Sequence, residues 1–495
     1  MTAGAWWYLL PPAVGIVAKR VMIAMALACE PRLVVADEPT SALDVMVQAQ
    51  VLSLLGGLVV ARGVALLLIS HDLSVLGASC ERLAVMYAGR VVESGPATAV
   101  LRAPAHPYTE ALVAAVPTVG DPASRRAPRG LPGDPPDPAN LPGGCAFHPR
   151  CPVRLPECAA QDVALRRVRS GHASGLRPRG AVVTALLQAD GLHVTFGAAR
   201  AVDGVDLALH AGEIVALVGE SGCGKSTLAR ALLGLRRPTA GQVLFDGAPL
   251  PTSARGLRRY RRVAQLIPQD PTGALNPRHT VYQSVAEGLR IHRLTDGESD
   301  RIAEALSRAG LRPPQRFFPV YPRELSGGQR QRVVIAGALA LRPRILIADE
   351  PVSSLDASVR GEILALLLRL RDDLGLAALV VTHDLGVAWS IADRVAVMYL
   401  GRIVETGPAE QVLRRPRHPY TSALLSVLSD GQAPVLLPGD PPDAARIPSG
   451  CRFHPRCPLL ATSTDPELAL RCRSVPLPVL TGDAGSAVAC HATGR

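Results

Sequence analysis

The chain has 495 residues, of which 48% are apolar, and a formal net charge of +11. This length and composition are typical of a globular protein with about two to four domains and sizeable cores. The arginines are dispersed along the chain, which argues against nucleic-acid binding. No apolar segment reaches the length of a membrane span, and the N-terminal segment lacks a basic stretch before its apolar run. We therefore expect a cytosolic protein without a secretory signal.

The first part of the chain returns in the second part. Residues Arg20–Asp44 reappear as Arg332–Asp356, at an offset of 312 residues, and the same offset relates His71 to His383. The repeat predicts two copies of one domain. Segments 117–144 and 170–180 are rich in Pro, Gly and Arg, which is typical of tails and linkers.

The second copy contains the sequence GESGCGKST, with the spacing of a phosphate-binding loop. In such a loop the backbone N–H groups cradle phosphates and the lysine reaches the β and γ phosphates. Lys225 is one of only two lysines among the 53 basic residues, as expected where a compact ammonium is needed. The apolar run 213–218 predicts a buried strand before the loop, and 228–235 predicts a helix after it. The predicted phosphate-binding residues are Gly219, Glu220, Ser221, Gly222, Cys223, Gly224, Lys225, Ser226 and Thr227.

Two further motifs follow downstream. The predicted strand 344–348 ends in two adjacent carboxylates, Asp349 and Glu350. Hard oxygen ligands suit Mg²⁺, and a carboxylate can act as base toward an attacking water, so this pair suits a nucleotidase. The sequence LSGGQ at 325–329 begins a predicted helix that runs to about Leu341, and its small residues would leave free N–H groups for an anion.

The order of these motifs resembles the ATPase domain of ABC transporters. The resemblance implies an α/β P-loop NTPase fold, with a mixed sheet and a helical subdomain, that binds ATP and Mg²⁺ and hydrolyses ATP. It implies that Ser226 binds Mg²⁺ and that Asp349 reaches the ion through water. Glu350 would polarise the attacking water, and His383 would contact the γ-phosphate.

The same resemblance assigns the remaining site residues. Gln269 would sense Mg²⁺ and signal to a membrane partner, and Phe196 would stack on adenine, with an ordinary core aromatic as the alternative. The signature loop would complete the site of an opposite subunit, so that two ATP molecules lie between two such domains. Its residues are Ser326, Gly327, Gly328 and Gln329.

The segments after the ATPase motifs indicate a branch of the family. Residues 417–425 and the proline-rich segment 436–458, together with 270–278, resemble the oligopeptide and dipeptide importer ATPases, a branch that also serves nickel and glutathione uptake. The resemblance implies two membrane permease subunits and an extracytoplasmic solute-binding protein as partners. It places the chain peripherally at the cytoplasmic face of the membrane.

Four regions are predicted on this basis. They are a truncated first ATPase domain at 1–117, a tail and linker at 118–180, a complete ATPase domain at 181–430, and a C-terminal Pro- and Cys-rich tail at 431–495.

The first copy departs from the family. The repeat would place its phosphate loop before Met1, and its signature is replaced by Ala-Val-Gly-Ile-Val at 13–17. Asp37, Glu38 and His71 remain, and we interpret them as inherited structure. Because neither site between the two copies would be complete, we expect activity to require an ATPase domain from another chain.

The ten cysteines argue against a disulfide framework in a cytosolic chain. The second tail holds Cys451, Cys457, Cys472 and Cys490. Four thiolates can hold Zn²⁺ or an iron–sulfur cluster, although this spacing matches neither a ferredoxin nor a zinc finger. The importer resemblance implies a [4Fe–4S] cluster here; zinc or plain thiols remain open, as does the membership of Cys472. The first tail has three matching cysteines, and we expect no cluster there.

Two alternative functions remain. A non-transport ABC ATPase of translation or DNA repair would share the nucleotide motifs, but not the tail. A decayed fusion would retain the first copy as an interaction module at most, with exposed apolar faces between Val21 and Leu58.

Overall fold

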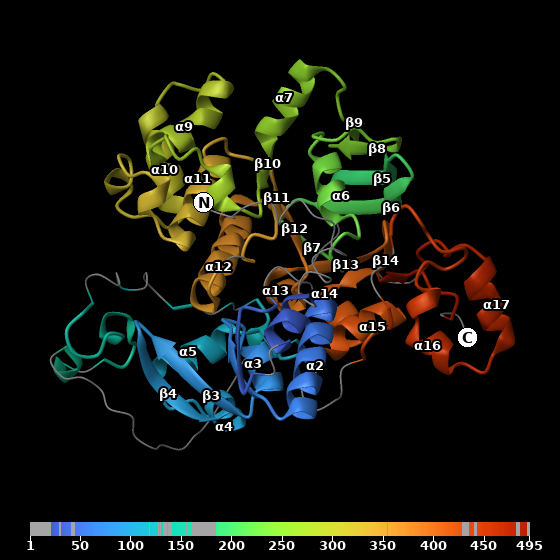
Figure 1. The fold of residues 1–495 in the computed structure, drawn as a ribbon. Coiled ribbons are helices and arrows are strands. Elements are labelled where there is room, and N and C mark those ends of the chain that lie inside the picture. Colours follow the sequence, from blue (N-terminus) through green and yellow to red (C-terminus); the bar gives the residue numbers. More distant parts are fainter. Residues whose placement is uncertain are drawn as a thin grey trace.

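The structure is a computed structural model in which both copies of the repeat are folded (Figure 1). It describes residues 21–28, 31–40, 45–117, 119–126, 128, 130–131, 136, 141–154, 156–159, 185–353, 355–427, 435–439, 443–481 and 486–492. The predicted signature replacement at 13–17, Cys29 and much of the predicted linker lie outside these residues.

The second copy is built on a seven-stranded mixed sheet in the order β10-β11-β12-β7-β13-β14-β15. The first five strands in this order are parallel, and β14 and β15 add antiparallel pairs. The strands are β7 (Ile214–Val218), β10 (Ala264–Ile267), β11 (Ile345–Asp349), β12 (Ala377–Thr382), β13 (Arg394–Tyr399), β14 (Arg402–Pro408) and β15 (Ala487–Val488). Every residue of β7, β11 and β12 is buried, as expected for parallel strands covered on both faces.

Two layers cover this sheet. On one face lie α6 and a four-stranded antiparallel sheet in the order β6-β5-β8-β9, which share one hydrophobic cluster with the central strands. The other face packs against a larger cluster contributed mainly by α9 to α15. The elements of the first layer are β5 (Ala185–Phe196), β6 (Ala199–His210), α6 (Lys225–Leu232), β8 (Ala240–Phe245) and β9 (Ala248–Pro249). The helices of the second copy are α7 (Ala254–Val263), α8 (Pro271–Ala274), α9 (Val281–Ile291), α10 (Glu298–Arg308), α11 (Gly327–Leu339), α12 (Ala357–Leu374), α13 (Leu385–Ile391), α14 (Ala409–Arg414) and α15 (Pro419–Ser426).

The first copy repeats the later elements of the second copy. Each of its strands and helices lies 312 positions before its counterpart, to within one residue at the ends. They are β1 (Leu33–Asp37), α2 (Val45–Arg62), β2 (Ala65–Ile69), α3 (Leu73–Ser79), β3 (Arg82–Tyr87), β4 (Arg90–Pro96), α4 (Ala97–Arg102) and α5 (Pro107–Ala115). Among the described residues, β1 pairs with β2 and β3 pairs with β4, without the strand that β7 supplies between β12 and β13. The predicted exposure of apolar faces is confirmed, since Met25, Leu33 and Val35 are more than half exposed.

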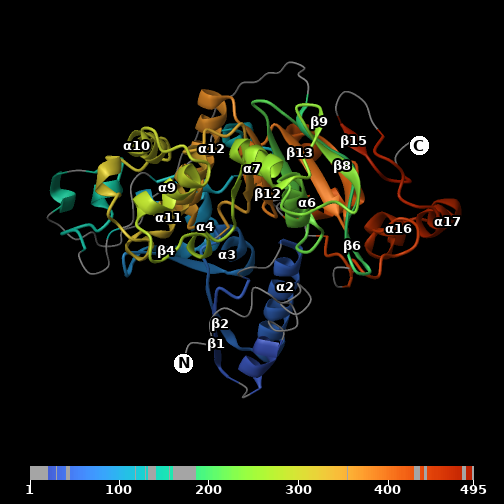
Figure 2. The same cartoon turned by 90° about the horizontal axis from the view of Figure 1, so that it is seen from above.

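The two copies contact each other through segments far apart in the sequence. Helices α5 and α12 lie side by side (Figure 1). Arg125 donates to the carbonyls of Trp389 and Ala392 at 2.6 Å each, and the buried Trp389 indole donates to Asp121 O at 3.1 Å. By contrast, β1, β2 and one end of α2 protrude from the rest of the molecule (Figure 2).

The C-terminal tail returns to the ATPase domain. It contains a 3₁₀ turn at His454–Arg456, α16 (Pro458–Thr462) and α17 (Pro466–Ser474), and β15 closes the central sheet. None of the helices in the described ranges combines the length and the apolar character that a membrane span requires.

Candidate functional site: a nucleotide site in the second copy

The phosphate loop connects β7 directly to α6. The predicted helix therefore begins earlier than expected, at Lys225, immediately after Gly224 with a left-handed φ of 109°. A Cβ at Gly224 would lie 2.0 Å from the carbonyl oxygen of Ala201, and one at Gly219 would lie 2.1 Å from that of Met398. Only glycine fits at these two positions, so the spacing of the motif follows from close backbone packing.

Lys225 lies inside this loop and is only 6% exposed. Its ammonium donates to Gly219 O at 2.7 Å and to Glu220 O at 2.9 Å. The lysine is thus held over the loop by two carbonyls, and an anionic phosphate would be a stronger partner for it.

The residues expected to hold Mg²⁺ lie together. Ser226 Oγ donates to Asp349 Oδ1 at 3.1 Å, which joins the start of α6 to the end of β11. Burial raises the pKa of Asp349, and the charge of the neighbouring Glu350 adds to this effect. The hydroxyl and carboxylate oxygens fit a hard divalent cation, whose charge would stabilise the ionised form of Asp349.

Glu350 is the centre of a hydrogen-bonded triad. His383 Nδ1 lies 2.9 Å from Glu350 Oε1, and Gln269 Nε2 donates to Glu350 Oε2 at 2.9 Å. Glu350 also has a left-handed φ of 48°, a conformation that non-glycine residues adopt rarely and that recurs at functional sites. The structure thus brings together three residues that are 81 and 33 positions apart in sequence.

The electrostatics of this triad favour a charged Glu350. Burial alone would raise its pKa, but the hydrogen bond and charge of His383, together with Lys225, lower the pKa below the usual carboxyl value. Burial alone would lower the pKa of His383, and the contact with Glu350 raises it instead. Glu350 is therefore ionised at neutral pH and can accept a proton from water.

The remaining predicted residues lie further out. Phe196 ends β5 and is 46% exposed, and the guanidinium of Arg236 lies 4.3 Å from the ring centroid. Phe196 is therefore a surface residue rather than part of the core. Ser326 and Gln329 form a reciprocal capping box at the start of α11, with hydrogen bonds of 3.1 and 3.2 Å.

The first copy retains the Glu–His part of the site. His71 Nδ1 lies 2.8 Å from Glu38 Oε1, and Glu38 has a φ of 45°, close to that of Glu350. These side chains are 41% and 34% exposed, whereas those of His383 and Glu350 are 26% and 14% exposed. Glu38 and His71 thus have the same geometry as Glu350 and His383, but the sequence of the first copy contains no phosphate loop.

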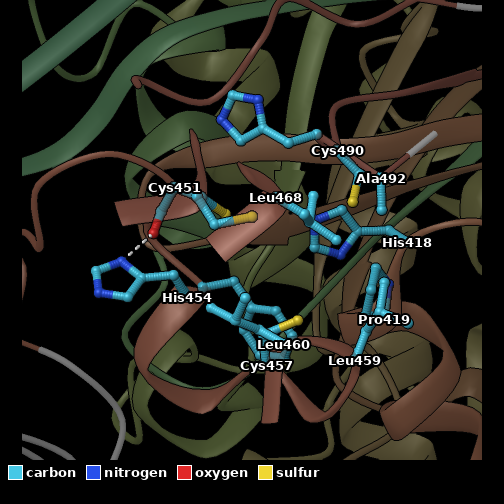
Figure 3. A pocket seen from close by; sticks show the side chains of 13 residues that line it. His418, Pro419, Cys451, His454, Cys457, Leu459, Leu460, Leu468, Cys490 and Ala492 are labelled. Carbon is cyan, nitrogen blue, oxygen red and sulfur yellow. Dashed lines mark hydrogen bonds between the residues drawn. The ribbon is translucent and has the colours of Figure 1, made fainter. Parts of the chain in front are cut away.

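The four cysteines of the second tail line one pocket (Figure 3). Burial and the neighbouring thiols raise the pKa of Cys451 to about 12. The backbone N–H of Cys451 donates to Cys472 O at 2.8 Å, just as Cys145 N donates to Cys158 O at 2.9 Å in the first copy. Cys472 is therefore the counterpart of Cys158 in the fold of the tail, although its spacing from Cys457 differs. No three His, Cys, Asp or Glu side chains of the described ranges are grouped closely enough to hold a single metal ion.

Sequence reasoning missed the contacts between this tail and the phosphate loop. Arg456 Nη1 donates to Glu220 Oε2 at 2.8 Å, and Tyr420 Oη accepts from Glu220 N at 2.8 Å. Arg452 forms a buried ion pair with Asp203 of β6. The available signal was weak: two arginines on either side of Phe453, in a segment bounded by cysteines.

Comparisons with known proteins agree with this geometry. The ABC transporter family matches residues 202–353, and the C-terminal region of oligopeptide/dipeptide transporters matches twice, at 92–158 and 404–462. The glutathione import ATP-binding protein GsiA of Escherichia coli K12 is 43% identical over 413 residues, which cover 83% of this chain and 63% of the relative. GsiA of Salmonella choleraesuis is 42% identical over 420 residues with the same coverage. The chain therefore spans less than two thirds of the length of these relatives.

Among solved structures, cbiO1 of Clostridium perfringens, part of an ABC transporter complex, is 31% identical. It covers 47% of this chain and 91% of its own, with a TM-score of 0.43. The chain is therefore similar to ABC transporter ATP-binding proteins, and it combines a segment that matches the ABC transporter family with two segments that match the C-terminal region of oligopeptide/dipeptide transporters.

Proposed function

We propose that the chain is the ATP-hydrolysing subunit of an importer for di- or oligopeptides or a related small solute such as glutathione. The observation that carries this proposal is the complete set of nucleotide-site contacts around Lys225, Asp349 and Glu350 in a chain that also has the transporter tail. It would act at the cytoplasmic face of the membrane, with two permease subunits and a solute-binding protein.

The site supports a hydrolysis mechanism in which each residue has one task. The loop N–H groups other than that of Glu220, together with Lys225, would bind the β and γ phosphates. Ser226 and Asp349 would hold Mg²⁺, which would neutralise charge on the phosphates. Glu350 orients the attacking water and accepts its proton. His383 Nδ1 lies 2.9 Å from Glu350 Oε1, and His383 would also contact the γ-phosphate. Gln269 joins Glu350 to the segment before α8.

Pairing with another ATPase domain is part of the proposal. The chain has one LSGGQ and one phosphate loop, both in the second copy, so a site of the two-domain type needs a signature loop from another chain. We expect MgATP turnover per chain to fall when the purified protein is diluted below its dimer constant. Steady-state rates over a dilution series measure this, and turnover independent of concentration would contradict the pairing.

We also propose that the tail thiols hold a [4Fe–4S] cluster. Cys451, Cys457, Cys472 and Cys490 line one pocket, and they would bind iron as thiolates.

The cluster is tested on full-length protein prepared anaerobically. We expect about four irons and matching acid-labile sulfide per chain, and we expect Cys472→Ser to lose them. The control is Cys158→Ser at the corresponding position of the first tail, which should keep them. An iron-free wild-type preparation would refute the cluster.

A further inference from the structure

The tail contacts the phosphate loop at one residue, Glu220, from two sides. The carboxylate of Glu220 accepts a hydrogen bond from Arg456, and these side chains are 3% and 5% exposed. The backbone N–H of Glu220 donates to the hydroxyl of the fully buried Tyr420 at 2.8 Å. Glu220 therefore points into the protein toward the tail, and its N–H is engaged there.

The same stretch of the loop is held on its other side by the lysine. Lys225 Nζ contacts the carbonyl oxygens of Gly219 and Glu220, the two residues at the start of the loop. If the ammonium turns to the phosphates of a nucleotide, it gives up one or both of these hydrogen bonds. The contact from Arg456 is made to the Glu220 carboxylate rather than to a loop N–H group, so it can persist when nucleotide binds. Tyr420 occupies the N–H of Glu220, so this N–H, which the sequence motif assigned to phosphate, is not among the phosphate donors in this arrangement.

The ion pair is better suited to fixing geometry than to adding stability. Removing two charges from water offsets most of the attraction between them, so a buried pair contributes little net free energy of folding. The geometry of the pair is nevertheless strongly specified, because either side chain without its partner would be an uncompensated buried charge that destabilises the fold. Arg456 also donates from Nε to Pro438 O at 3.2 Å, which fixes its direction within the tail.

We propose that Arg456 and Tyr420 are positioning residues for nucleotide binding. Both residues contact Glu220 and thereby keep the start of the phosphate loop in its conformation. They do so while the Lys225 ammonium turns from the loop carbonyls to the phosphates. The C-terminal tail is then a part of the nucleotide site rather than an appendage to the ATPase domain. This inference rests on the proposed ATP-binding function of the loop.

The first copy contains counterparts of Tyr420 and Arg456, so it shows which of their contacts belong to the tail fold alone. Its Tyr87, Tyr108 and Phe147 rings pack with centroid distances of 4.6, 5.1 and 5.3 Å. The corresponding rings of the second copy are 4.7, 5.2 and 5.4 Å apart. Arg150, the counterpart of Arg456, is also buried and donates to Leu131 O at 3.2 Å. The tail fold is thus shared, whereas only the second copy has a phosphate loop in its sequence.

The experiment compares matched variants of the full-length chain. MgADP affinity is measured by isothermal titration, and KM and kcat for MgATP are measured at a fixed protein concentration. We expect Arg456→Met and Tyr420→Phe each to raise Kd and KM about threefold to tenfold, the loss of one net hydrogen bond. Because Glu350, His383 and Gln269 are untouched, kcat should stay near the wild-type value. Arg150→Met and Tyr108→Phe should leave Kd and KM unchanged.

The split between KM and kcat separates positioning from a merely structural effect. Partial unfolding would lower the active fraction and hence the apparent kcat, without moving the KM of the molecules that remain folded. Unchanged Kd in a folded Arg456→Met variant, or an equal rise in Arg150→Met, would overturn the inference. If Arg456→Met fails to fold, Tyr420→Phe, which loses one hydroxyl, decides alone. Absence of MgADP binding in the wild type would instead refute the proposed function and the inference with it.

Discussion

Replacing Glu350 by glutamine is expected to lower the rate of ATP hydrolysis by about 10²- to 10⁴-fold, the usual contribution of a general base. The amide keeps the size of the side chain and can still hydrogen-bond to Gln269 and His383, so the end of β11 should keep its shape. It cannot accept the proton of the attacking water at neutral pH. ATP affinity should remain within about a factor of two or three, because the phosphate contacts come from Lys225 and the loop.

The first copy offers a matched control for this prediction. Glu38→Gln changes the same type of residue, with the same left-handed backbone and the same histidine partner at 2.8 Å. We expect no loss of hydrolysis from it, since no phosphate loop accompanies Glu38 in this chain. Single-turnover and steady-state rates of both variants measure the outcome. A loss for Glu38→Gln comparable to that for Glu350→Gln would mean that the first copy contributes to catalysis.

Most residues of the nucleotide site could be predicted from local sequence patterns. The phosphate loop could be predicted because its glycines are required by contacts that recur wherever the motif occurs, and here Gly219 and Gly224 each lie against a carbonyl oxygen. The end of β11 was predictable for a related reason, since a fully buried strand followed by two carboxylates leaves them at the edge of the sheet. The resemblance placed His383 and Gln269 in the site, but it did not predict their hydrogen bonds to Glu350, because contacts between distant segments leave no local signal.

The repeat also predicted much of the first copy. Helix α2 and helix α12 both have 18 residues and begin 312 positions apart, and β1 and β11 match in the same way. The two tails differ at one position. Arg452 is paired with Asp203 in the second copy, whereas Ala146 stands at the matching position of the first copy.

The link between the tail and the loop was beyond sequence reasoning. Arg456 and Glu220 are 236 positions apart, and the local sequence around either residue does not indicate that the two form a pair. Many arginines of this chain could satisfy one glutamate. The same limit applied to Cys472, whose place opposite Cys451 depends on how α16 and α17 close the tail. Both contacts are decided by tertiary packing rather than by spacing.

Replacing Lys225 by methionine is expected to weaken MgATP binding by at least about 100-fold, because charge-assisted hydrogen bonds to two phosphates are lost. Methionine fills a similar volume, so the loop should remain folded although the carbonyls of Gly219 and Glu220 lose their donor. Lys225→Arg should also bind poorly, since Lys225 is only 6% exposed and the planar guanidinium does not fit the space of a compact ammonium. Equilibrium titration of the wild type and both variants with MgATP measures their affinities. Circular dichroism of the same three proteins shows whether each is folded.

The control for charge is the only other lysine of the chain. Lys19→Met removes the same net charge at a position 206 residues earlier in the sequence, and we expect it to leave affinity unchanged. The same titration gives a stoichiometry, which we expect to be one nucleotide per chain, because the sequence contains one phosphate loop in two copies of the repeat. Two nucleotides per chain in the wild type, with one retained in Lys225→Met, would contradict this expectation. Such a result would mean that Glu38 and His71 of the first copy serve a second site whose phosphates are bound without a lysine of this kind.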